Sequence, residues 1–108
     1  MLVELDIFSG RPNPSWELDE RASGRLREAH AALLQTTVPP PELPGLGYRG
    51  FVYRLDDIAW RAFRGSISNG RRTLADPDRS IERLLAGWLP PELADLRVRI
   101  FSELEPGG

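Results

Sequence analysis

Residues 48–75 read YRGFVYRLDDIAWRAFRGSISNGRRTLA and predict the centre of an antiparallel β-sheet. Their first eight residues form one predicted strand, whose side chains alternate between two faces. One face carries Arg49, Phe51, Tyr53 and Leu55, and the other carries Tyr48, Gly50, Val52 and Arg54. One face is expected to be core. The other would expose aromatic or guanidinium groups, which either bind a partner or protect a sheet edge.

The rest of this stretch predicts a turn followed by a hairpin. Asp56 and Asp57 favour a turn after the first strand, with a longer loop as the alternative. Residues 59–68 and 71–75 are predicted to pair, because Asn69–Gly70 is a strong two-residue hairpin signal.

Further strand signals lie near the N-terminus. Residues 2–9 alternate apolar and acidic side chains, which is typical of a half-buried strand. The prolines of FSGRPNPSW, residues 8–16, then stiffen the backbone and end this strand. Trp16 and Leu18 predict a very short second strand or the entry to a helix.

Three segments predict helices. Asp19 is a plausible N-cap for a helix over residues 20–36, and the Asp-Pro pair that opens residues 76–89 predicts the start of a second. Residues 91–104 fit helical and strand spacing, and we favour a helix, followed by a frayed EPGG tail. Between the first helix and the central sheet, PPPELPGLG (39–47) predicts an exposed, partly polyproline II loop, the longest irregular segment and therefore a functional candidate.

These elements predict a single α+β domain over residues 1–108. Its expected architecture is one antiparallel sheet of four to five strands packed on one face by two or three helices. The sequence contains no apolar run near the roughly 20 residues of a membrane span and no signal-peptide pattern, which predicts a cytoplasmic protein without a membrane partner.

Composition excludes several kinds of chemistry. The net charge of −2 argues against general nucleic-acid binding. The absence of cysteine excludes disulfides and thiolate sites, and all 14 basic residues are arginine, which excludes lysine Schiff bases. The single histidine, His30, fits a partly buried helical position better than a general base. We therefore predict no catalytic residue, no metal and no cofactor, with a carboxylate-dependent hydrolase or cyclase as the least favoured alternative.

Three parts of the sequence are candidate binding surfaces. The stiff loop at residues 8–16 offers a recognition surface, although its polar side chains also suit bonds to nearby backbone. The predicted strand at residues 48–55 is dense in Tyr and Arg, and a tryptophan beside two arginines would suit a peptide contact if it were exposed. The predicted peptide-binding residues are Arg11, Asn13, Arg49, Phe51, Arg54 and Trp60.

Three motifs carry a resemblance to a known group. They are FSGRPNP with Trp16, LGYRGF at residues 46–51, and the DP-R-helix-WL segment at residues 76–89. With them, most of the chain up to Leu89 resembles small bacterial proteins of unknown function, including precursor-peptide-binding proteins of crocagin-type ribosomal peptide (RiPP) biosynthesis. The segment from Pro90 onward does not match.

The resemblance implies a non-catalytic module that binds the leader of a precursor peptide. An extended leader could add to an open sheet edge, and arginines such as Arg49 and Arg54 would favour an acidic one. Trp60 would then serve as an apolar anchor. The alternative is a small dimeric accessory subunit that stabilises a partner biosynthetic protein, in which case a homodimer could cover the same surface.

Overall fold

The computed structural model describes residues 1–8 and 10–105. The described strands are β1 (Leu2–Leu5), β2 (Ser15–Glu17), β3 (Leu34–Gln35), β4 (Phe51–Leu55), β5 (Ile58–Phe63), β6 (Ser66–Ser68) and β7 (Thr73–Ala75). The helices are α1 (Glu20–Ala31), α2 (Ser80–Gly87) and α3 (Ala94–Leu104), and a short 3-10 turn, η1 (Pro91–Leu93), precedes α3. Ser9, at the predicted end of the first strand, and most of the predicted tail (106–108) lie outside the described residues.

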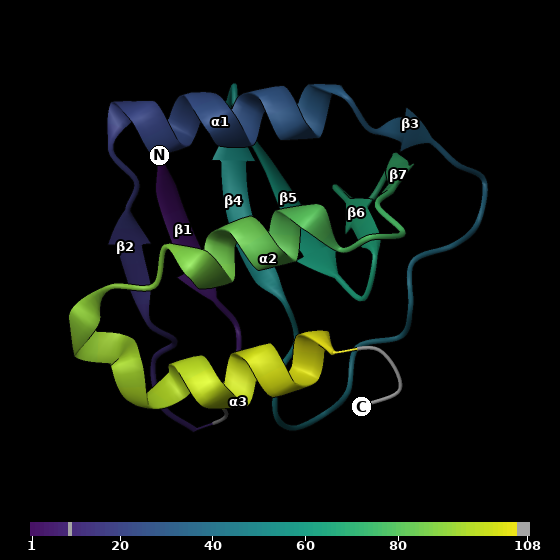
Figure 1. Cartoon of the computed structure of the whole chain (residues 1–108). Helices are drawn as coiled ribbons and strands as arrows, with labels where there is room; N and C mark the ends of the chain where they lie inside the picture. Colours follow the sequence, from purple (N-terminus) through teal and green to yellow (C-terminus); the bar gives the residue numbers. More distant parts are fainter. Residues whose placement is uncertain (9, 106–108) are drawn as a thin grey trace.

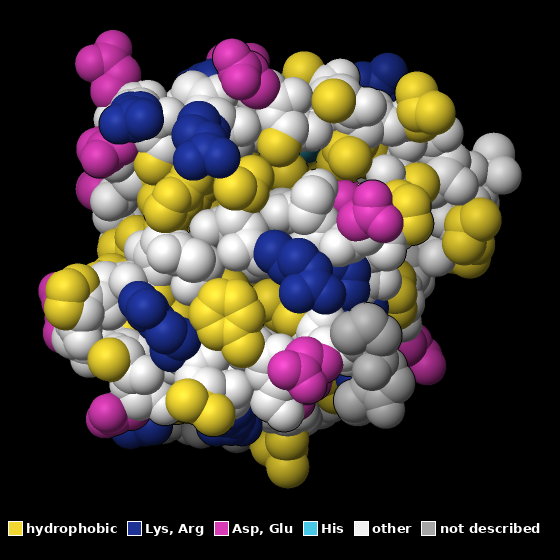
Figure 2. Space-filling model, viewed as in Figure 1, with side chains coloured by type: hydrophobic (Ala, Val, Ile, Leu, Met, Phe, Trp, Pro, Cys, Tyr) yellow, Lys and Arg dark blue, Asp and Glu magenta, His cyan; other side chains and the backbone are white. Residues whose placement is uncertain are grey.

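The strands form one antiparallel sheet in the order β2-β1-β4-β5-β6-β7-β3. All three helices lie on the same face of this sheet (Figure 1). Apolar side chains fill the spaces between them, and arginines and acidic groups surround these spaces (Figure 2). The predicted α+β class with an antiparallel sheet is confirmed.

The predicted number of strands is wrong, since seven strands replace four to five in the described chain. The segment 59–68 splits into β5 and β6 because Arg64 and Gly65 adopt positive φ angles of 48° and 81° and form a turn. The predicted Asn69–Gly70 hairpin does join β6 and β7, but through a four-residue loop. Within it, Asn69 Oδ1 accepts hydrogen bonds from the backbone N–H groups of Arg71 and Arg72.

The first predicted helix begins where expected and ends early. Asp19 is its N-cap, because Asp19 Oδ1 accepts a hydrogen bond of 2.8 Å from Ala22 N. The predicted end at residue 36 is wrong, since Leu34 and Gln35 instead pair with β7 as the edge strand β3. The backbone groups of these two residues therefore bond to the sheet and not to the helix.

The second helix begins at Ser80, later than predicted. Asp76 Oδ2 still accepts from Ile81 N at 2.9 Å, and Asp76 Oδ1 accepts from Ser80 Oγ at 2.7 Å. Pro77 lies in a turn before the helix, because Arg79 at the N-cap adopts a positive φ of 56°. For residues 91–104, the favoured helix is confirmed as η1 and α3.

The predicted alternation across residues 48–55 breaks at Gly50. From Phe51 onward the prediction is confirmed, since residues 51, 53 and 55 are buried and residues 52 and 54 lie on the other face. Gly50 has a φ of +93°, which reverses the sides of the residues before it. Tyr48 therefore reaches α2, and Arg49 reaches Asp6 on the uncovered face, so the predicted faces of these two residues are wrong.

A buried carboxylate joins this glycine-containing bend to α2. Glu82 is 1% exposed and accepts a 2.6 Å hydrogen bond from the Tyr48 hydroxyl. Nε and Nη2 of Arg79 each donate to it at 3.0 Å, and the backbone N–H groups of Arg64 and Gly65 donate at 3.1 Å. Burial by itself would raise the pKa of Glu82, but the bonds from Arg79 and Tyr48 lower it overall.

We expect Glu82→Gln to lower the free energy of unfolding by about 3 kcal/mol at pH 7, because the Arg79 guanidinium would lose its buried partner. Because the pKa of Glu82 is lowered in the folded chain, its stabilisation is complete above its ordinary value of 4.5. It is lost as pH falls through the folded pKa. Urea unfolding across acidic pH should therefore show the gap between the two proteins closing.

The matched control is Glu28→Gln in α1, where the side chain is exposed. This variant should unfold within about 0.5 kcal/mol of the original protein at every pH. Equal stability of the Glu82 and Glu28 variants would contradict the structural role of the buried carboxylate.

A second prediction compares two glycines that share a φ of +93°. A Cβ at Gly50 would lie 2.2 Å from the Ala62 backbone oxygen, whereas a Cβ at Gly70 meets nothing within 4 Å. Gly70→Ala should therefore cost only the conformational penalty, about 1 kcal/mol. Gly50→Ala should cost about 3 kcal/mol, because the strands must also move apart. Urea unfolding of both variants measures the difference, and equal losses would show that the close approach to β5 is unimportant.

Candidate functional site

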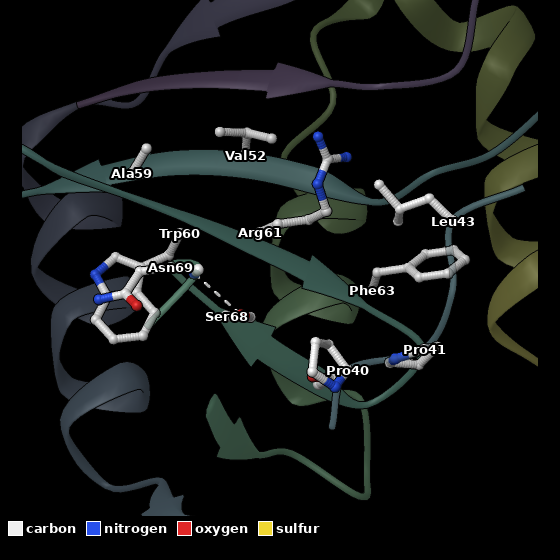
Figure 3. Close-up of a pocket in the computed structure, with 12 residues that line it drawn as sticks. Pro40, Pro41, Leu43, Val52, Ala59, Trp60, Arg61, Phe63, Ser68 and Asn69 are labelled. Atoms are coloured by element: carbon white, nitrogen blue, oxygen red, sulfur yellow. Dashed lines mark hydrogen bonds between the residues drawn. The ribbon is translucent and has the colours of Figure 1, made fainter. Parts of the chain in front are cut away.

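The face of the sheet opposite the helices is only partly covered. The segment 39–47, here called the strap, lies in the connection from β3 to β4, which runs down the right side of the view in Figure 1 and turns below the sheet. A groove of about 350 Å³ lies between the strap and strands β4 to β6 (Figure 3). Its lining residues are Pro40, Pro41, Leu43, Val52, Ala59, Trp60, Arg61, Phe63, Ser66, Ser68, Asn69 and Gly70.

The groove continues on both sides. Beyond Pro41, a depression of about 210 Å³ lies between the strap and β7. In the other direction, a depression of about 160 Å³ shares Val52 and Ala59 with the groove and reaches Glu4 on β1. Together they form a shallow path across the strands from β1 to β7, which suits an elongated ligand better than a compact one.

The groove surface is mainly apolar with a few polar groups. Leu43, Val52 and Ala59 contribute apolar surface, and Arg61 extends from β5 past Val52 (Figure 3). Ser66 lines both the groove and the depression beyond Pro41, and its hydroxyl oxygen is buried without a hydrogen-bond partner in the described chain. An unpaired buried hydroxyl costs roughly 1–3 kcal/mol, a cost that a polar ligand group could remove.

Two arginines converge on one carboxylate at the edge of the groove. Arg61 Nη1 donates to Asp6 Oδ2 at 2.8 Å and to the Arg49 carbonyl at 2.7 Å. Arg49 Nε lies 3.6 Å from the same Asp6 oxygen, beyond hydrogen-bond distance, and is buried without a partner. Asp6 Oδ1 accepts from Asn13 Nδ2 at 3.2 Å. Asp6 therefore fixes the guanidinium of Arg61 beside the groove.

The predicted recognition loop at residues 8–16 is held mainly by its own bonds. Asn13 Oδ1 accepts from the backbone N–H groups of Ile7 and Phe8 at 3.0 and 2.8 Å. The Arg11 guanidinium lies 3.7 Å from the centre of the Phe8 ring. The alternative reading of the loop, that polar side chains bind nearby backbone, thus accounts for Asn13.

The structure separates the six predicted binding residues. Phe51 is 0% exposed and lies in the core. Trp60 is only 6% exposed, so it is not the exposed tryptophan that a peptide contact would need, although it contributes to the lining of the groove (Figure 3). Trp60 alternates to the helix-covered face, where its ring lies 4.6 Å from that of His30. Arg54 is exposed on the uncovered face. Asn13 and Arg49 meet through Asp6, whereas Arg11 stacks on Phe8.

Among the six predicted binding residues, only Trp60 lines the groove. Strand alternation over residues 58–63 would have placed Ala59, Arg61 and Phe63 on one face, as the structure does. That signal was obscured because the predicted strand ran on through Arg64–Gly65. The strap was predicted as a functional candidate, and the structure places it along the groove.

The groups with shifted pKa values are not among the residues that line the groove. His30 Nδ1 is 2.9 Å from the Tyr53 hydroxyl, and burial lowers the pKa of His30. Burial, and secondarily Asp76, raises the pKa of Tyr53. The described lining of the groove includes no histidine, aspartate or glutamate. Among residues 1–8 and 10–105, no three metal-ligating side chains are grouped to hold an ion.

Comparison with protein-family models, with curated proteins and with solved structures finds no match to this chain. The motif resemblance to precursor-peptide-binding proteins therefore stays a prediction. Within the described part of the chain, no helix has both the length and the apolar character to cross a membrane.

The two polar residues of the loop at 8–16 can be tested against each other. We expect Asn13→Ala to lower the free energy of unfolding by about 1–2 kcal/mol, because two backbone N–H groups lose their acceptor. Arg11→Ala should cost about 0.5 kcal/mol, the value of an exposed cation–π contact. Thermal and urea unfolding check both values. A larger loss for Arg11→Ala would overturn the assignment of Asn13 as the structural residue.

Proposed function

We propose that this chain is a non-catalytic peptide-binding module that takes an extended segment along the groove beside the strap. The observation that carries the proposal is the groove itself, an apolar path on the uncovered face with Arg61 and an unpaired Ser66 hydroxyl beside it. Apolar clefts with a few placed polar groups are the usual form of binding sites. The length of the path, from β1 to β7, favours an extended chain as the occupant.

The ligand class follows from the motif resemblance together with this groove. We propose that the segment is the leader of a precursor peptide of ribosomal peptide biosynthesis, bound in the cytoplasm. The sequence resemblance predicts addition of the leader at a sheet edge. The groove offers a different place, where side chains of the peptide would contact Leu43, Val52 and Ala59.

A second candidate is a dimeric accessory subunit. One observation favours it: the edge strand β3 carries Leu34, which is 77% exposed, next to a backbone edge that no described strand covers. Pairing of two β3 edges would bury this leucine. Sedimentation of the purified chain separates the candidates, since a monomer at micromolar concentration removes the dimer.

The peptide-binding proposal predicts that filling the groove blocks binding. Isothermal titration calorimetry with the precursor peptides encoded beside the gene should detect binding to the original protein. Ala59→Trp should weaken that binding at least about tenfold, because an indole would occupy the apolar path.

The matched control is Ala31→Trp at the end of α1, an exposed position away from the groove. It adds the same ring and should leave affinity unchanged. Absence of binding to any neighbouring precursor peptide, or equal affinity in the two tryptophan variants, would reject the groove as the site.

A further inference from the structure

The charges around the groove are predominantly positive. Arg54 and Arg64 line the depressions at its two ends, and Arg61 lines the groove itself. The exposed Arg71 and Arg72 follow Gly70 at its rim. A field of this kind favours an anionic partner.

Acidic groups near the groove do not neutralise these arginines. Glu4 lines the depression at β1 and Glu42 is exposed in the strap, and in the described part of the chain neither forms an ion pair. Asp6 serves both Arg49 and Arg61. One carboxylate beside two guanidinium groups leaves one positive charge unbalanced at the edge of the groove.

Arg61 is the best placed of these arginines to meet a ligand. Its Nη1 is held by Asp6 and by the Arg49 carbonyl, so the orientation of the planar group is set before anything binds. In the described structure its Nε and Nη2 have no hydrogen-bond partner. A guanidinium that is already oriented loses little conformational freedom when it binds a carboxylate.

We propose that the groove selects a peptide segment with an acidic side chain among apolar ones, and that Arg61 recognises the carboxylate. This inference rests on the proposed peptide-binding function and adds the class of sequence that is bound. The carboxylate of the peptide would accept hydrogen bonds from Nε or Nη2 of Arg61 while neighbouring apolar side chains contact Val52 and Ala59. Asp6 acts as a positioning residue, because it orients Arg61 and does not face the ligand-lining surface.

The test compares peptides that differ only in charge. Fluorescently labelled ten-residue peptides of Val, Leu, Pro and Ser, with one central Glu, are screened by polarisation against the intact chain, together with partners that carry Gln instead. We expect the Glu peptides to bind about five- to tenfold more tightly at 50 mM salt. The preference should shrink at 300 mM salt, since the site is partly open to solvent.

Variants of the protein test which residue causes the preference for Glu peptides. Arg61→Gln should bind Glu and Gln peptides equally, and Arg61→Lys should restore only part of the preference, because lysine lacks the planar fork. Arg21→Gln, an exposed charge removed from α1, should leave the preference intact. If circular dichroism shows that Arg61→Gln does not fold, Arg61→Lys tests the role of Arg61, and the Glu and Gln peptides on the unmodified protein test acidic selection.

Different results would reject peptide binding in the groove and the selection of acidic peptides by Arg61. Equal binding of Glu and Gln peptides, with binding still blocked by Ala59→Trp, would overturn acidic selection and leave the groove as a peptide site. A preference for Glu that survives Arg61→Gln in a folded protein would overturn the role of Arg61. If no peptide binds, both the proposed function and this inference are rejected.

Discussion

The buried carboxylate of Glu82 is the interaction on which this fold depends. It lies in α2, yet its donors come from the bend before β4, from the turn between β5 and β6, and from the residue that begins α2. One ionised group thus satisfies Tyr48, Arg79 and two backbone N–H groups that would otherwise be unpaired. Because breaking a buried ion pair costs several kcal/mol, these segments are held in their positions together. The same contacts show that Tyr48 of LGYRGF and Arg79 of the DP-R segment stabilise the fold.

Asp6 plays a comparable part on the uncovered face. It joins Asn13 of the stiff loop, Arg49 of the bend and Arg61 of β5, so that three segments distant in sequence meet at one carboxylate. Both carboxylates are buried, and the difference lies in the arginine that each one holds. Glu82 is enclosed and its donors are all used, whereas Arg61 is partly exposed and keeps donors that Asp6 does not use. Only the second arrangement leaves a group that can meet a ligand.

Signals within a few residues of one another predicted much of the fold. Features that depend on contacts between distant segments could not be predicted from such signals. The alternation at Phe51, Tyr53 and Leu55 and the cap at Asp19 depend on neighbours within a few residues, and both were predicted correctly. The turn at Arg64–Gly65 depends on Glu82, which lies 17 residues beyond Gly65 and accepts its N–H. Nothing local marks Arg64 for a positive φ, so β5 and β6 were merged into one strand. Because the end of β5 was not predicted, Arg61, the central residue of the candidate site, was not predicted as a binding residue.

The structure also changes which sequence features bear on function. Motif residues attract attention as binding residues, but Asn13, Arg49 and Tyr48 are committed to contacts within the fold. The groove uses side chains outside the motifs, supplied by β4 to β6 and by the strap. Such a division is physically reasonable, because a groove keeps its shape only if the groups beneath it are already paired. Structural motifs with a separate groove would let related chains keep one fold while binding different segments. Differences among such chains should therefore concentrate at positions such as Val52, Ala59 and Ser68, whose side chains line the groove and lie outside the core.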